Sequence, residues 1–89
     1  TDMDFEYDPV KSEANQQKHG IDFMDSQRLW DDPRRLVVPA RSAGETRFAL
    51  IARYSDKIWT CIYTPRRAGI RIISTRRARH EEENHYHKY

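Results

Sequence analysis

Cysteine, glycine and long apolar runs are scarce in this 89-residue chain, and each scarcity excludes a class of protein. The one cysteine, Cys61, cannot form a disulfide within the chain, which favours a reducing compartment such as the cytoplasm. No apolar run approaches the roughly 20 residues that a membrane-spanning helix needs. The chain does not open with a basic stretch followed by an apolar one, so the sequence predicts no signal peptide.

Three glycines and four prolines are also too few for a low-complexity chain, whereas ten aromatic residues supply bulky side chains for a core. A chain of 89 residues can bury only a modest core, so we expect a single domain over residues 1–89. Such a domain suits a small enzyme or a binding module and excludes a two-domain cofactor protein.

Positive and negative charges are nearly equal in number, but they lie in different segments of the chain. The net charge is +2, yet residues 33–80 hold twelve bases and two acids, a net charge of +10. The flanking segments are acidic, with −6 over residues 1–32 and −2 over residues 81–89. A basic segment of this size attracts polyanions or an acidic protein surface.

Two helices are expected in the first third of the chain. The first covers residues 9–19, because Asp8 can cap its start and Gly20 suits the left-handed residue that follows a helix. Asp22 is expected to cap a second, shorter helix, which ends before Pro33.

Strands are predicted over residues 5–7, 36–38, 47–54, 58–64 and 70–75. Short turns between the last four favour an antiparallel four-stranded sheet. The tail from Arg76 to Tyr89 carries acids early and bases late, which suits a final helix. The expected fold class is α+β: a short N-terminal strand, two helices, the sheet and a C-terminal helix, with the helices on one face of the sheet. Strict alternation along the last strand puts Arg71 and Arg77 on one face and Arg76 on the other.

The most basic stretch, residues 66–79, has six arginines and no acid. The six are Arg66, Arg67, Arg71, Arg76, Arg77 and Arg79. Arginine presents a planar fork of donors that matches phosphate oxygens, so this density favours a surface for RNA phosphate or for an acidic partner. The alternative is a solvated basic surface without a ligand.

Other reactive side chains have structural alternatives. His19 can act as a general acid or base. At the end of a helix it can instead form hydrogen bonds with the last carbonyl groups, and this structural role is favoured. His80, Glu83 and His87 share one helical face, for which solvent exposure is favoured over a metal site. Cys61 lies among aliphatic residues of a strand and is expected to be buried and unreactive.

Six short motifs follow one another along residues 5–86. They are Phe5-Glu6-Tyr7-Asp8-Pro9-x-Lys11-x-x-x-Asn15-x-x-Lys18-His19-Gly20-Ile21-x-Phe23, Trp30-x-Asp32-Pro33, Gly44-Glu45-x-Arg47-Phe48, Tyr63-Thr64-x-Arg66, Ile70-Arg71-Ile72-Ile73-Ser74-x-Arg76-Arg77-Ala78, and Glu82 with Tyr86. In this order and spacing the sequence resembles the BrnT family of type II toxins. It departs from the family at Glu83, where an arginine is usual, and at Ala52, where a glycine is usual.

The resemblance implies a RelE-like fold and a ribonuclease toxin that cleaves RNA and inhibits translation. It also implies neutralisation by a BrnA-like antitoxin with a ribbon-helix-helix DNA-binding part, and we expect a dimer of heterodimers. The alternative function is a non-catalytic basic module that binds nucleic acid or an acidic protein partner. RNA cleavage by the purified protein distinguishes these two functions.

Site residues are assigned from this resemblance and from the chemistry of RNA. The 2′-OH of RNA is the nucleophile, so the expected endoribonuclease needs no metal and no cofactor, only groups that position the phosphate and stabilise charge. Phosphate and transition-state stabilisation are assigned to Arg66, Arg71, Arg76 and Arg77. Assistance to proton transfer is assigned to Lys18 or His19. RNA binding is assigned to Arg47, Arg67 and Tyr63, with a core position as an equal alternative for Tyr63.

Overall fold

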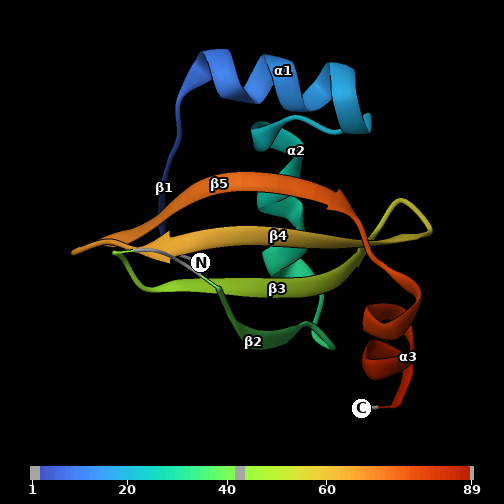
Figure 1. The fold of residues 1–89 in the computed structure, drawn as a ribbon. Coiled ribbons are helices and arrows are strands. Elements are labelled where there is room, and N and C mark those ends of the chain that lie inside the picture. Colours follow the sequence, from blue (N-terminus) through green and yellow to red (C-terminus); the bar gives the residue numbers. More distant parts are fainter. Residues whose placement is uncertain (1–2, 42–43, 89) are drawn as a thin grey trace.

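A computed structural model describes residues 3–41 and 44–88 of the chain. Their elements are β1 (Asp4–Glu6), α1 (Pro9–His19), α2 (Phe23–Ser26), the 3₁₀ helix η1 (Gln27–Asp31), β2 (Leu36–Ala40), β3 (Arg47–Tyr54), β4 (Lys57–Pro65), β5 (Gly69–Arg77) and α3 (His80–Lys88) (Figure 1). The predicted α+β class is confirmed. None of the helices in the described part of the chain is long and apolar enough to cross a membrane.

Both predicted helix starts and the predicted end of the first helix are confirmed. Asp8 accepts a hydrogen bond from the Val10 N–H at 2.9 Å, and Gly20 follows α1 with a φ of +82°. Asp22 accepts from the Asp25 N–H at 2.8 Å at the start of α2. After Ser26 the chain tightens into η1, which ends at Asp31, ahead of Pro33 as expected.

All five strands form one mixed sheet in the order β1-β5-β4-β3-β2. The four predicted antiparallel strands pair as expected, and β1 adds a fifth strand parallel to β5, with Phe5 beside Ile70. Gly69 permits this pairing, because a Cβ atom there would overlap the backbone of Asp4. The contact joins segments that are far apart in the sequence, which local sequence patterns do not reveal.

Three strands extend beyond their predicted ends, and β4 does so by one residue on each side. β2 continues through Pro39, which is tolerated because an edge strand does not need every N–H donor. β5 continues to Arg77, which pairs with Trp59 of β4, so the final helix begins at His80 and not near Arg76. Tyr89, the last residue of the predicted tail, lies outside the described residues.

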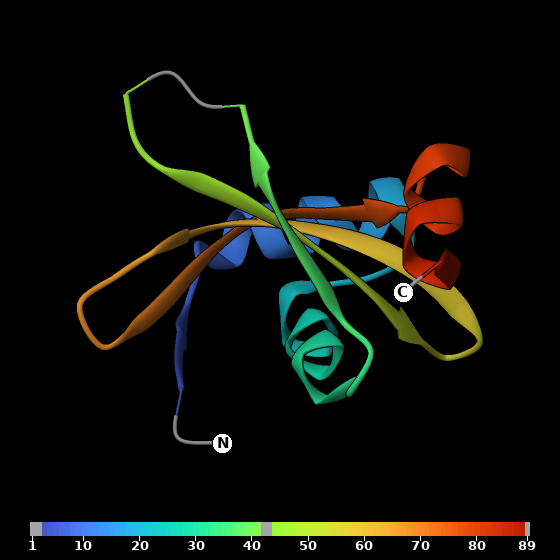
Figure 2. The ribbon, with the colours of Figure 1, turned by 90° about the horizontal axis from the view of Figure 1, so that it is seen from below.

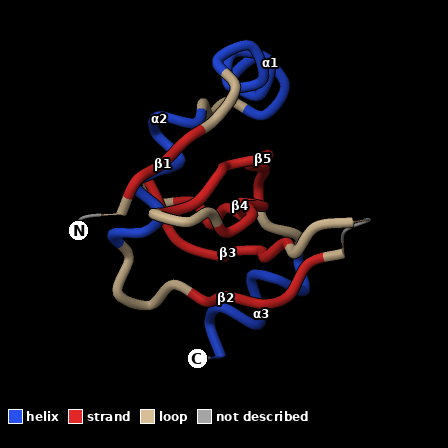
Figure 3. Tube along the Cα trace, turned by 90° about the vertical axis from the view of Figure 1, so that its left-hand side faces the viewer, coloured by secondary structure: helices blue, strands red, loops and turns tan. Residues whose placement is uncertain are grey.

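Helices lie on both faces of the sheet, contrary to the prediction of one covered face. α1, α2 and η1 pack against what we call the covered face, where Phe23 and Leu29 join the core with Leu50. α3 packs on the other, open face through Tyr86, which contacts Ile51. Figure 2 shows α2 and α3 on different sides of the strands, and Figure 3 shows α1 beyond β5 and α3 beside β2. The chain switches faces after Arg77, where the Ala78 N–H bonds to the Ile58 carbonyl at 2.9 Å.

Buried hydrogen bonds fix the helical layer to β5. The Asn15 side chain donates to the carbonyls of Ile21 at 2.7 Å and Thr75 at 2.9 Å, and accepts from the Thr75 N–H at 3.2 Å. The Ser26 hydroxyl donates to the Thr75 hydroxyl at 2.8 Å. Within the described part of the chain, every buried side-chain nitrogen and oxygen has a hydrogen-bond partner. Cys61 is buried as predicted, and burial raises its thiol pKa to about 12.

Candidate nucleic-acid interface

A bulge in β5 decides which arginines share the open face. β5 pairs Ser74 with Ile62 but Ile72 with Tyr63, so Ile73 is an extra residue in the ladder. This extra residue reverses the alternation of side chains along the rest of the strand.

Arg71 and Arg76 therefore lie on the same open face. Arg77 lies on the covered face, with its guanidinium 5.6 Å from the centre of the Trp59 ring. The prediction from strict alternation, which grouped Arg71 with Arg77, is wrong because it assumed a regular strand.

The open face holds a shallow depression of about 430 Å³ with an apolar floor and a basic margin. Its floor includes Ala49, Ile62 and Ile73. A smaller depression of about 90 Å³ shares Arg47 and Ile73 with it. We call the cations of the two depressions the basic surface: Lys11, Arg41, Arg47, Arg66, Arg71, Arg76 and Arg79.

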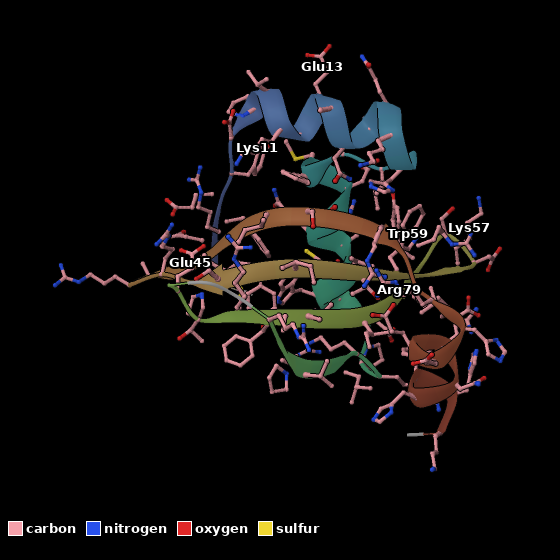
Figure 4. All side chains as sticks on the ribbon, in the orientation of Figure 1. Lys11, Glu13, Glu45, Lys57, Trp59 and Arg79 are labelled. Atoms are coloured by element: carbon pink, nitrogen blue, oxygen red, sulfur yellow. The ribbon has the colours of Figure 1, made fainter. Side chains whose placement is uncertain are left out.

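The basic surface draws on elements that are distant in the sequence. Lys11 comes from α1, Arg47 from β3 and Arg76 from β5. Figure 4 shows Arg79 at the end of the sheet from which α3 begins, with Glu45 at the opposite end. The surface therefore extends along the strands, as contact with successive phosphates of one strand of RNA requires.

Arg76 is the most firmly held arginine of this surface. Its Nη1 and Nη2 donate to the two carboxylate oxygens of Glu82 at 2.8 and 2.9 Å. The same carboxylate accepts from the Arg79 N–H at 2.7 Å and from the Thr60 hydroxyl at 3.0 Å. Burial raises the pKa of Glu82, but these hydrogen bonds lower it by more, to about 2. Glu82 is therefore fully ionised at neutral pH.

The other arginines form looser ion pairs. Arg47 lies 3.0 Å from Glu45, and Glu6 lies 2.9 Å from Arg66 and 3.9 Å from Arg71. The side chains in these pairs are between 35% and 52% exposed. Exposed ion pairs contribute about 0–1 kcal/mol, so a phosphate can displace these carboxylates.

α3 is fastened to the sheet at a second point by Tyr86. Its hydroxyl donates to Asp32 at 2.6 Å, and Asp32 also accepts from the Arg53 N–H at 2.8 Å and the Arg34 N–H at 2.9 Å. Burial raises the pKa of Asp32, but these bonds bring it below its ordinary value. Sequence reasoning gave Glu82 and Tyr86 no role, although their spacing of four residues places them on one side of a helix.

Several residues singled out in the sequence lie away from the basic surface. Lys18 and His19 end α1, in the layer on the covered face. Arg67 lies in the β4–β5 turn, beside a different depression that Asp4 lines. Tyr63 is 9% exposed and packs in the core, with its ring centre 5.3 Å from that of Trp30, which is the core alternative left open by the sequence.

The fold and this surface define a class of protein: a small α+β protein whose open sheet face gathers arginines. The family model described as ribonuclease toxin, BrnT, of type II toxin-antitoxin system matches residues 7–82. The chain therefore belongs to the BrnT family of ribonuclease toxins, as its motifs indicated. Among curated proteins, none matches the sequence.

Proposed function

We propose that the protein is a metal-independent endoribonuclease that binds RNA on the open face, acts in the cytoplasm and inhibits translation by cleaving RNA. The depression that gathers Arg47, Arg76 and Arg79 over an apolar floor is the observation that carries this proposal. Guanidinium groups bind phosphate oxygens, and apolar side chains between them accommodate ribose and base. A fixed arginine fork also stabilises charge that develops on a phosphate during reaction.

The reaction uses the 2′-OH of the RNA as the nucleophile. Its oxygen attacks the adjacent phosphorus while the bond to the 5′-oxygen of the next nucleotide breaks. The products are a 2′,3′-cyclic phosphate and a 5′-OH. The 2′-OH loses one proton and the leaving 5′-oxygen gains one, so no net proton is released or consumed. Arg76 and Arg47, which line the same depression, are proposed to hold the phosphate in line and to stabilise its charge.

The proposal changes the roles that the sequence assigned to some residues. Arg77 and the pair Lys18 and His19 belong to the covered side of the sheet, so we leave them out of the reacting site. Arg66 and Arg71 are proposed to bind a neighbouring phosphate of the RNA, because both line the smaller depression. Proton transfer then falls to water or to groups beside the basic surface.

A BrnA-like ribbon-helix-helix antitoxin is proposed to neutralise the protein by covering the basic surface with acidic side chains. The antitoxin's DNA-binding part would then join two such complexes into a dimer of heterodimers. An inhibitor of this kind competes with RNA directly, so the antitoxin and RNA are expected to exclude one another.

The proposal is tested by incubating the purified protein with RNA in the presence and absence of EDTA. We expect cleavage in both, with 2′,3′-cyclic phosphate ends or the 3′-phosphate derived from them. Arg76→Ala is expected to lower the rate by about 100- to 1,000-fold, as loss of one preorganised donor does. His87→Ala, on the exposed side of α3, serves as the control and should cleave like the wild type.

Products with a 5′-phosphate, or activity that EDTA abolishes and a divalent metal restores, would contradict this mechanism. Binding of RNA without cleavage by any preparation would instead indicate a non-catalytic basic module.

A further inference from the structure

The guanidinium of Arg76 uses only one of its two donor edges inside the protein. Nη1 and Nη2 hold Glu82, and Nη1 also donates to the Arg77 carbonyl at 3.3 Å. The other edge consists of Nε–H and the second hydrogen of Nη2. No hydrogen bond from this edge reaches any residue in the described part of the chain.

Glu82 is held from two sides and is therefore a rigid support. Thr60 reaches it from β4, and the Arg79 N–H reaches it from the residue before α3. The side chains of Arg76 and Glu82 are only 24% and 21% exposed. Partial burial strengthens the pair relative to an exposed one, so Arg76 is restricted to one orientation at the margin of the depression.

We propose that Glu82 is a positioning residue for Arg76, holding one edge of the guanidinium so that the other edge is presented to the phosphate of the bound RNA. This inference rests on the proposed function and adds a residue to it. Two oxygens of a phosphate match the free Nε–H and Nη2–H fork as a bidentate pair. Because Glu82 occupies the opposite edge, the carboxylate and the phosphate do not compete for the same donors.

A competing view is that Glu82 inhibits the site by neutralising Arg76. The two views predict opposite effects of removing the carboxylate charge. A positioning role means that Glu82→Gln loses activity, because a mobile arginine must be ordered during the reaction. An inhibitory role means that the same variant gains activity, because Arg76 is released.

The experiment compares Glu82→Gln with Glu81→Gln in cleavage of a short RNA under single-turnover and steady-state conditions. Both substitutions remove one acid from the first turn of α3, but Glu81 is exposed and makes no hydrogen bond to Arg76. We expect Glu82→Gln to lower kcat by about 100-fold with KM changed by less than a few fold, because misplacement of a catalytic group costs about this much. Glu81→Gln should match the wild type.

A second measurement follows the Arg76 Nε–H resonance in ¹⁵N spectra, assigned by its loss in Arg76→Lys. The probe is an oligonucleotide of the same base sequence with 2′-deoxy sugars, which carries the phosphates but not the nucleophile. In the wild type this resonance should shift on binding of the probe. In Glu82→Gln the shift should be absent, although the probe still binds through the other arginines.

The inference is overturned if Glu82→Gln cleaves as fast as the wild type or faster, or if its Nε–H resonance shifts as the wild type's does. If Glu82→Gln fails to fold by circular dichroism, Glu82→Asp replaces it; this variant keeps the charge but is too short to hold both Arg76 and Thr60, and is expected to lose kcat. If the wild type binds but does not cleave RNA, the proposed function fails, and the Nε–H measurement alone decides the role of Glu82.

Discussion

At the scale of single residues, the motif side chains divide between those that hold the fold and those that face the open surface. Asn15 belongs to the first group: it is 7% exposed and bonds to Ile21 in the α1–α2 loop and to Thr75 in β5. Arg47 and Arg76 belong to the second, since both line the larger depression. A motif therefore identifies an important position without saying which of these two tasks it has.

Asn15→Ala is expected to destabilise the protein by about 3 kcal/mol, because it leaves buried carbonyl and N–H groups of Ile21 and Thr75 without partners. Asn84→Ala, at an exposed position of α3, is the control and should change the free energy of unfolding by less than about 0.5 kcal/mol. Urea unfolding followed by tryptophan fluorescence measures both. Equal stability of the two variants would show that the Asn15 network contributes little.

At the scale of elements, α3 has few apolar contacts and depends on polar bonds. Tyr86 is the one buried residue of this nine-residue helix. Its hydroxyl bond to Asp32 and the Glu82 bonds to Thr60 and Arg76 hold the two ends of α3 to the sheet and the loop before β2. The orientation of α3, and with it the basic surface beside it, is therefore sensitive to the ionisation of Glu82.

The contribution of Glu82 to stability is expected to vanish in acid. Its pKa falls from an ordinary 4.5 to about 2 on folding, so the folded state favours the ionised form. The stabilisation is complete above about pH 5 and is lost as the pH falls toward 2. At pH 7, Glu82→Gln should be less stable than the wild type by about 2 kcal/mol, the typical value for hydrogen bonds to a charged group.

Unfolding in urea between pH 7 and pH 2 measures this dependence. The difference in free energy of unfolding between wild type and Glu82→Gln should shrink steadily below pH 5. A difference that stays constant over this range would contradict the depressed pKa of Glu82.

At the scale of the whole molecule, the division of charge along the chain becomes a division in space. The basic stretch supplies β3, β4 and β5, and six of the seven cations of the basic surface come from residues 33–80. The acidic first third supplies the helices on the covered face. An anionic partner is therefore attracted to one side of the molecule.

Association with the proposed antitoxin should depend on salt through this asymmetry. Complementary charge accelerates encounter, so the association rate should fall steeply as the salt concentration rises, whereas the dissociation rate should change little. The double substitution Arg47→Ala and Arg66→Ala should flatten this dependence, and Lys57→Ala, at the start of β4, is the control. Stopped-flow measurements across a salt series give both rates. An association rate indifferent to salt, together with RNA binding to the complex, would place the antitoxin elsewhere.

Much of the molecule follows from local sequence. Asp8, Gly20 and Asp22 set helix ends because capping depends on neighbouring residues only. Alternating apolar residues set β3 with its observed bounds, because the period of a strand is local too. The ordered motifs identified the BrnT family. The anionic ligand that the density of arginines indicates stays a prediction.

The tertiary structure alone decided how these parts meet. The Ile73 bulge put Arg71 and Arg76 on one face, and it is seen in the pairing of β5 with β4, not in a pattern within β5. The pairing of β1 with β5 and the crossing of α3 to the open face join residues far apart in the chain. The pairing of Arg76 with Glu82 could not be predicted from the sequence either, because it depends on how the chain turns between β5 and α3. Capping and alternation depend on neighbours in the sequence, whereas a binding surface depends on the packing of the whole chain.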